Sequence, residues 1–330
     1  MPKYQNILHN PRRLKAMTGL DRDAFDQLLP HFQHALEQLM SRQTIDGYVR
    51  EGRRFTSYRN SPLPTVEDKL LFILTYLKIN PIQEMQGQMF HMSQSNVSKW
   101  FHLLHDVLNL ALAQQQHIPA RNAQELAKIL QNRIDRTDDD PDDAGDDTAG
   151  DDDAAPLRFF HDGTERPINR PTDQDAQEFY YSGKSKQHAV KNVLVVDEAR
   201  RIDYLSDTYE GKAHDKRIAD ESGYRLPEGS ILYQDTGFQG FHLDGVMIVQ
   251  PKKKPKGGTL TAEEKEENRR ISSIRVSIEH VIGSVKRFSI VRETIRLWCD
   301  VVRDKVMETC CGLHNFLLSV RNLRIASHEP

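Results

Sequence analysis

Ten aspartates lie between positions 138 and 153 of this 330-residue chain, and that interval contains no lysine or arginine. A run built from Asp, Ala, Gly and Thr cannot bury apolar surface, so it predicts a disordered, extended linker. We assign residues 135–156 to this acidic linker. We therefore expect it to separate two domains, one before it and one after it.

The charge outside the linker is basic. The formal net charge of −3 becomes +7 once those ten aspartates are set aside. A basic surface fits a polyanionic partner such as nucleic acid. The acidic linker could then be a plain spacer, or it could imitate DNA charge and compete for that surface. No apolar run reaches the 18 or so residues of a membrane span, and the N-terminus lacks a secretory apolar segment, so we expect no membrane partner and a cytoplasmic chain.

The part before the linker has helical periodicity. Residues 1–62 predict a helical region with one apolar stripe, for which Asp21 is the expected cap. Residues 63–134 predict three helices with Ser93 as N-cap of the last: Val66–Ile79, Ile82–Phe90 and Gln94 to about Leu112.

Hydrogen-bonding side chains gather at the start of the third helix. They are Gln94, Ser95, Asn96, Ser98 and Lys99. A helix-turn-helix presents its recognition helix to the major groove of DNA in this way. A plain three-helix bundle with a polar face fits the same pattern, and the segment alone leaves both interpretations open.

After the linker the pattern changes to α/β, with strands expected from 157 to 162, 187 to 196, 201 to 208, 231 to 235 and 246 to 250. Two of these strands end in an aspartate followed by turn residues, at Asp162 and Asp235. Polar groups at strand ends are where α/β sheets build their sites. A single Asp-Gly at a strand end is also a common turn, so neither residue is diagnostic alone.

The stretch 271–288 predicts an amphipathic helix. Arg275, Glu279 and Lys286 fall on one stripe of it, because steps of four and seven residues nearly close whole turns. This stripe could be a solvated face with an ion pair. Alternatively, Glu279 could join Asp162 and Asp235, since three carboxylates suit Mg²⁺ and a two-metal site for phosphoryl chemistry.

Five ordered blocks carry a resemblance to a known family. They are HDGTERPINRP (161–171), YYSGKSKQHAVKN (180–192), GKAHDK (211–216), YQDTGFQG (233–240) and the stretch 249–288. Together they resemble the DDE-type insertion-sequence transposases, in particular insertion-sequence family five and its Harbinger relatives. The resemblance covers most of residues 157–320, and the preceding helices resemble that family's N-terminal domain.

The resemblance implies a ribonuclease-H-like mixed-sheet catalytic core at 157–330, behind an all-helical N-terminal helix-turn-helix domain. By motif, Asp162, Asp235 and Glu279 match the catalytic residues that hold two Mg²⁺ ions, with Mn²⁺ as a substitute. Residues expected to contact DNA are Arg275, Lys286, Lys252, Lys253 and Lys254, besides those of the third helix.

The implied activity is cut-and-paste transposition. The chain would bind the terminal inverted repeats of double-stranded DNA, cleave at the element ends and join the 3′-OH to target DNA. We expect a homodimer or larger assembly on DNA, associated with the bacterial nucleoid. Two alternatives are a metal-dependent endonuclease without strand transfer and a catalytically silent, domesticated DNA-binding regulator.

Overall fold

A computed structural model describes residues 3–52, 61–138, 156–297 and 299–326 of the chain. Contacts divide the chain into two compact units. The first combines residues 1–118 with residues 284–330, and the second spans residues 119–283. Most of the expected acidic linker lies outside the described residues, but its first four positions, 135–138, continue a helix. No helix in the described part of the chain is long and apolar enough to cross a membrane.

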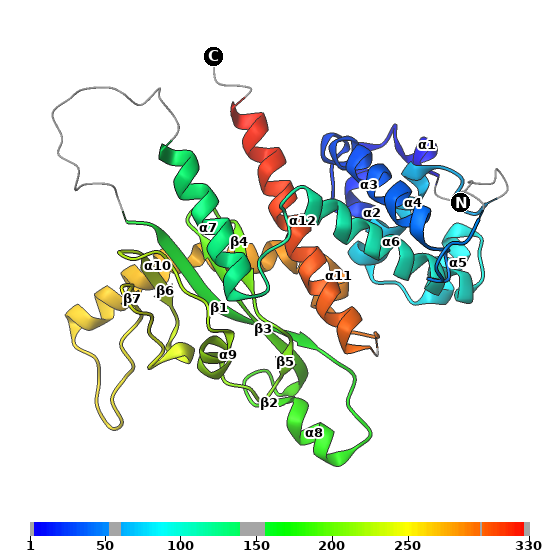
Figure 1. The fold of residues 1–330 in the computed structure, drawn as a ribbon. Coiled ribbons are helices and arrows are strands. Elements are labelled where there is room, and N and C mark those ends of the chain that lie inside the picture. The colour runs from blue at the N-terminus through cyan, green and yellow to red at the C-terminus, as the bar shows by residue number, and fades with distance from the viewer. Residues whose placement is uncertain (1–2, 53–60, 139–155, 298, 327–330) are drawn as a thin grey trace. The chain divides into compact units, whose positions relative to one another are not determined.

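The first unit is helical (Figure 1). Its elements are α1 (Tyr4–Ile7), α2 (Pro11–Thr18), α3 (Arg22–Arg42), α4 (Val66–Ile79), α5 (Gln83–Phe90), α6 (Gln94–Gln114), α11 (Ser289–Arg292) and α12 (Asp300–Ala326). The expected helices from 66 to 112 are confirmed, and α4 begins and ends at the residues that the periodicity predicts.

Local capping explains where these helices begin and end. Asp21 accepts a hydrogen bond from the backbone N–H of Ala24 at 3.0 Å, and Ser93 accepts one from Asn96 at 3.4 Å. Both expected N-caps are therefore confirmed. Asn80 ends α4 in the left-handed conformation, at φ 52°, which asparagine tolerates better than most residues.

The C-terminal part of the chain packs against the N-terminal helices. On α6, Asn109 donates to Glu308 at 2.8 Å and to Thr309 at 3.0 Å. His105, also on α6 and buried, lies 3.0 Å from the Thr309 hydroxyl. The expected domain 157–330 is thus divided by the contacts, since α12 belongs with α6 and not with the sheet. Local sequence patterns could not predict this packing, because α6 and α12 lie far apart in the sequence.

We predict that Thr309→Val destabilises the first unit by about 1–3 kcal/mol, because burying His105 without its partner leaves a desolvated polar group. Thermal unfolding would measure the loss. Ser319→Ala on the same helix removes a hydroxyl that bonds only to the backbone of Phe316, and is the matched control. Equal stability of the two variants would contradict this account of the packing.

The second unit is a mixed sheet with helices. Its elements are α7 (Ala123–Asp138), β1 (Arg158–Pro167), α8 (Gln174–Tyr180), β2 (Tyr181–Ser182), β3 (Gln187–Asp197), β4 (Ile202–Leu205), β5 (Tyr209–Glu210), α9 (Asp215–Ser222), β6 (Ile231–Gln234), the 3₁₀ turn η2 (Thr236–Phe238), β7 (Met247–Val249) and α10 (Ala262–Val285).

β1 lies at the centre of the sheet. The strand order is β2-β3-β1-β6-β7, with β4 and β5 also pairing with β3. β1 is antiparallel to β3 and parallel to β6, which in turn is parallel to β7. This mixed sheet, preceded by the helical region, confirms the predicted fold class and is consistent with a ribonuclease-H-like core.

One face of the sheet carries the apolar core. Leu126 and Leu130 of α7 and Ile218 of α9 pack there with Phe159 and Leu232. His161 points to the same face, where it is fully buried and its ring lies 3.9 Å from that of Phe238. Burial lowers the pKa of His161 to about 3, so it is a neutral packing residue. Because side chains alternate along a strand, Asp162 points to the other face.

Candidate active site

The two strand-end aspartates come from neighbouring strands. Parallel pairing of β1 with β6 stops at His161 opposite Gln234, so Asp162 and Asp235 are the next residues of each strand. The expectation that the first strand ends at Asp162 is wrong, because β1 continues to Pro167 through its antiparallel pairing with β3. At Asp162, β1 is therefore still paired with β3 on one side, while its pairing with β6 on the other side has ended.

The environment of Asp162 opposes its negative charge. Its side chain is 17% exposed. Burial raises its pKa to about 6, the nearby Arg275 guanidinium lowers it, and repulsion by Asp235 raises it further. The backbone N–H of Gly163 donates to its Oδ1 at 2.8 Å. The carboxylates of Asp162 and Asp235 are thus held near each other, and the neighbouring protein groups offset the negative charge of Asp162 only in part.

Helix α10 brings one of its three stripe residues to this position. Arg275 is buried, and its Nη2 lies 3.8 Å from Oδ2 of Asp162. Glu279 is exposed one turn later, about 6 Å further along the helix axis. Lys286 falls just beyond the helix, which ends at Val285 and not at the expected residue 288.

The donor set partly fits a divalent cation. Asp162 and Asp235 supply hard oxygen ligands, and the raised pKa of Asp162 marks a buried charge that a cation would compensate. Within the described ranges, no three His, Cys, Asp or Glu side chains are close enough together to hold a metal ion. Glu279 thus lies on the helix beside the aspartate pair, without completing a three-ligand cluster.

A buried charge network lies beside the pair, and the sequence reasoning missed it. Lys191 of β3 is only 7% exposed. Its Nζ lies 3.2 Å from Asp215 and 3.5 Å from Glu165, and donates to the carbonyl of Ala213 at 2.9 Å. Asp215 is the first residue of α9, and His214 precedes it as the N-cap. The lysine inside the apolar run of β3 could have indicated this network from the sequence, because a buried charge needs a partner of opposite charge.

Asp215 packs against the glycines that follow both aspartates. A Cβ atom added to Gly163 would lie 2.8 Å from its Oδ1, and one added to Gly237 would lie 2.9 Å from its Oδ2. The Gly237 Cβ would also lie 2.8 Å from Oδ1 of Asp235. The Asp-Gly-Thr and Asp-Thr-Gly sequences therefore need glycine because the Asp215 carboxylate approaches the backbone closely at both positions, apart from any preference of glycine for turns.

The basic loop before α10 is exposed and tied to that helix. The side chain of Asn268 accepts from the backbone N–H of Lys252 at 2.8 Å and donates to its carbonyl at 3.0 Å. Lys252 also pairs with Glu264 at 3.3 Å. Lys253 and Lys254 are exposed. The contacts of Lys252 with α10 thus fix the position from which the exposed lysines of the loop extend.

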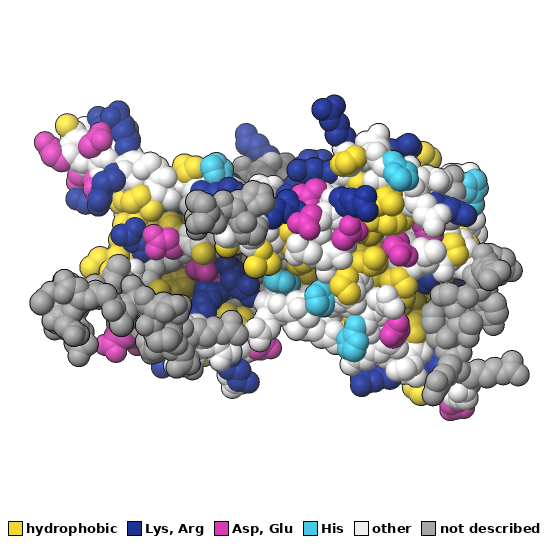
Figure 2. Space-filling view, turned by 90° about the horizontal axis from the view of Figure 1, so that it is seen from above, with side chains coloured by type: hydrophobic (Ala, Val, Ile, Leu, Met, Phe, Trp, Pro, Cys, Tyr) yellow, Lys and Arg dark blue, Asp and Glu magenta, His cyan; other side chains and the backbone are white. Residues whose placement is uncertain are grey.

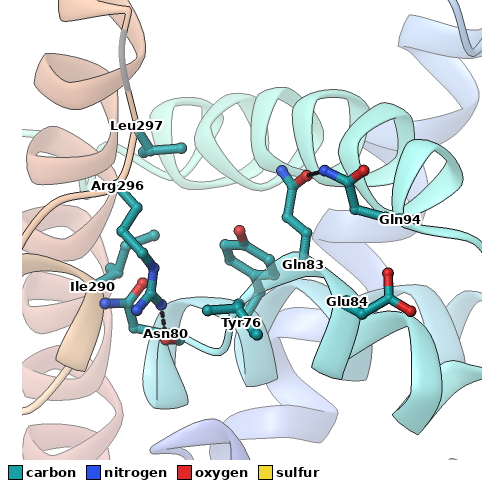
Figure 3. A pocket seen from close by; sticks show the side chains of 9 residues that line it. Tyr76, Asn80, Gln83, Glu84, Gln94, Ile290, Arg296 and Leu297 are labelled. Atoms are coloured by element: carbon teal, nitrogen blue, oxygen red, sulfur yellow. Dashed lines mark hydrogen bonds between the residues drawn. The ribbon is translucent and has the colours of Figure 1, made fainter.

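The polar residues at the start of α6 are mostly exposed, as a recognition helix requires. Ser98 is half-buried, and Lys99 pairs with Asp46 at 2.7 Å. Gln94 donates to Gln83 of α5 at 2.9 Å, and the hydroxyls of Ser93 and Ser95 lie 3.0 Å apart. Figure 3 shows the two glutamines at the rim of a pocket of about 460 Å³, facing Arg296, which donates to the Asn80 carbonyl. Several of these groups already have partners, which DNA would have to replace.

Charges of both signs are mixed on the surface. On the described part of the face in Figure 2, lysine, arginine, aspartate and glutamate side chains are interspersed, without one large patch of a single sign. On this face, contacts to a polyanion would therefore depend on particular residues and not on a continuous basic surface.

Comparisons with known families match both halves of this architecture. Residues 161–315 match the family of the DDE superfamily endonucleases, and residues 61–114 match the helix-turn-helix of DDE superfamily endonucleases. The first match contains Asp162, Asp235 and Glu279, and the second contains α4, α5 and α6. The chain thus carries a DDE superfamily endonuclease region behind its helix-turn-helix, and the resemblance seen in the sequence is confirmed.

A curated relative agrees with this family. The chain is 34% identical over 135 residues to the probable transposase for insertion sequence element IS702 of Microchaete diplosiphon. The alignment covers 41% of this chain and 48% of the relative, so the chain spans about half of the relative's length. No solved structure matches the chain significantly.

We predict that Asp162→Asn stabilises the metal-free protein by about 1–3 kcal/mol at pH 8. The pKa of Asp162 in the folded state, about 6, lies above its value of 3.8 in the unfolded chain. The folded state therefore binds that proton more tightly, and the ionised carboxylate destabilises it above pH 6. The difference should fade as the pH falls towards 4. Chemical unfolding in a chelator at both pH values measures it.

The same variant tests the fit to a cation. Mg²⁺ should raise the unfolding temperature of the wild type, because it binds the folded state, and should raise that of Asp162→Asn less. An equal rise in both proteins would show that Asp162 does not hold the cation.

We predict that Gly163→Ala disrupts the site, since its Cβ would overlap the Asp215 carboxylate that Lys191 holds in place. Gly283→Ala is the control, because a Cβ there meets no atom within 4 Å and alanine favours a helix. Unfolding free energies should fall for Gly163→Ala and stay level or rise for Gly283→Ala. A Gly163→Ala protein as stable as wild type would contradict the close approach.

Proposed function

We propose that the chain is a cut-and-paste DNA transposase. The observation that carries the proposal is the placement of Asp162 beside Asp235 on adjacent parallel strands, within a region of the DDE superfamily endonuclease family. The helix-turn-helix would bind the terminal inverted repeats of the element, and the similarity to a probable transposase supports this class of activity.

The reaction is a pair of phosphoryl transfers. Water attacks the phosphodiester at the element end, the P–O3′ bond breaks, and the leaving oxygen takes a proton to become a 3′-OH. That hydroxyl then attacks a target phosphodiester and displaces a target 3′ oxygen. Two Mg²⁺ ions, or Mn²⁺ in their place, would activate the attacking oxygen and stabilise the leaving one.

Named residues have distinct roles in this proposal. Asp162, Asp235 and Glu279 would hold the cations, and Glu279 would need to turn its exposed side chain towards the aspartates. Arg275, beside Asp162, would stabilise charge on the phosphoryl oxygens.

DNA-backbone contacts would come from two places. Lys286 and the basic loop (Lys252, Lys253, Lys254) would contact phosphates near the reaction. Gln94, Ser95, Asn96, Ser98 and Lys99 would contact the terminal repeats. We expect two copies or more on DNA, because one reaction must pair two element ends.

We predict that Asp162→Asn and Glu279→Gln each lower metal-dependent cleavage of the element's own end sequences by roughly 100-fold or more, because the carboxylates supply several kcal/mol through the cations. Repeat binding should remain. Glu266→Gln on the same helix is the control, since Glu266 is exposed and pairs with Arg269 of that helix. Wild-type cleavage rates in the two site variants would refute these roles.

Product analysis separates the alternatives. Joined target DNA would support a transposase, cleavage without joining would indicate an endonuclease, and repeat binding without cleavage in Mg²⁺ or Mn²⁺ would indicate a DNA-binding regulator.

A further inference from the structure

Three of the sequence blocks that resemble the transposase family, 180–192, 211–216 and 233–240, contribute residues to one cleft. Most of these residues have no role in the proposed reaction. The cleft has a volume of about 520 Å³ and opens beside Asp235. Its walls come from three segments. They are residues 181–184, which form β2 and the start of the turn to β3, residues 211–215, before and at the start of α9, and residues 235–237. In Figure 1, β2, β5 and α9 gather at one end of the sheet, which is where this cleft lies.

An aromatic ring lies at the wall of the cleft. Tyr181 is 43% exposed although tyrosine rings are largely apolar, and its ring packs edge to face with that of His188, with the ring centroids 5.7 Å apart. The neighbouring Phe179 is 49% exposed but does not line the cleft. An exposed aromatic ring beside a phosphoryl-transfer site is suited to stacking on a nucleic-acid base, since every base has a π-face.

Two lysines line the same cleft. Lys184 lines the cleft, is exposed, and lies close enough to Asp162 to lower its pKa. Lys212 also lines the cleft and pairs with Glu178 at 2.6 Å. The cleft thus offers a positive group near Asp162, suited to a phosphate, and an exposed aromatic residue, suited to a base.

The floor of the cleft is fixed. Lys191 and Asp215 line it, and their contact at 3.2 Å is buried. Glu165 joins Lys191 from β1 and accepts from Ser182 at 2.8 Å, which ties the 181–184 segment to the central strand. Asp162 lies in β1, which pairs with β3, and Tyr181 pairs with β3 beside Ser182. These contacts therefore fix the position of Tyr181 relative to Asp162.

We propose that this cleft binds the nucleotide adjoining the scissile phosphate, with its base out of the duplex stack and lying against the ring of Tyr181. Lys184 would contact the phosphate of that nucleotide. The inference rests on the proposed function, which places the scissile phosphate at Asp162 and Asp235. The volume lies within the roughly 300–1,000 Å³ of sites for small ligands, enough for a single nucleotide.

The test is an abasic scan of the element-end duplex, cleaved in Mg²⁺ by wild type and Tyr181→Ala. On intact DNA, Tyr181→Ala should cleave roughly 5- to 100-fold more slowly, the range for loss of one base–aromatic stack. At one position next to the cleaved bond, removing the base should slow the wild type similarly and leave Tyr181→Ala unchanged. Tyr181→Phe keeps the ring and should cleave at the wild-type rate. Phe179→Ala is the matched control and should also match wild type.

Two kinetic results would overturn the inference. One is wild-type cleavage by Tyr181→Ala. The other is a loss in Tyr181→Ala that stays the same at every abasic position, since the ring would then act without contacting a base.

A second measurement separates this inference from the proposed function. Oligonucleotides of the element end, with 5-iodouracil placed at single positions, are irradiated with the full chain, and the crosslinked residue is identified by mass spectrometry. A crosslink at Tyr181 supports the nucleotide site even if the wild type cleaves nothing, which would refute only the proposed function. Crosslinks confined to other residues overturn the nucleotide site even if cleavage occurs.

Discussion

The parallel pairing of β1 with β6 is the constraint on which the site depends. It ends at His161 and Gln234, and so places two carboxylates side by side where the strands part. Burial of Asp162 raises its pKa, and repulsion by Asp235 raises it further, so the ionised pair is unfavourable in the folded protein. The sheet and its core supply the free energy that keeps Asp162 and Asp235 together. A cation bound there would offset this cost and would thereby stabilise the folded state.

A second buried network holds the surroundings of the pair. Lys191 joins β3, β1 and the start of α9 through Glu165, Asp215 and the Ala213 carbonyl. Asp215 in turn fills the space that side chains at Gly163 and Gly237 would occupy. The geometry of the aspartate pair is thus set by contacts behind it as well as by strand pairing. The same Lys191 and Asp215 line the nearby cleft, so the proposed nucleotide site and the proposed reaction site would share these contacts.

Much of this architecture could be predicted from local patterns, and the exceptions have physical reasons. Helix α4 and the caps Asp21 and Ser93 follow from periodicity and hydrogen bonding within a few residues. The continuation of β1 past Asp162 depends on pairing with β3, which no local pattern encodes. The end of α10 at Val285 and the packing of α12 on α6 are likewise tertiary effects. Family motifs identified Asp162, Asp235 and Glu279, but only the structure relates Lys191 and Asp215 to them.

The central claim is that Asp162, Asp235 and Glu279 together hold divalent cations, and metal-directed backbone cleavage tests it most directly. Fe²⁺ bound in place of Mg²⁺ generates hydroxyl radicals that cut the chain close to the ion. The account predicts cuts near residues 162, 235 and 279, suppressed by excess Mg²⁺ and lost in Asp162→Asn. Cuts that avoid residue 279, or that persist unchanged in Asp162→Asn, would contradict it.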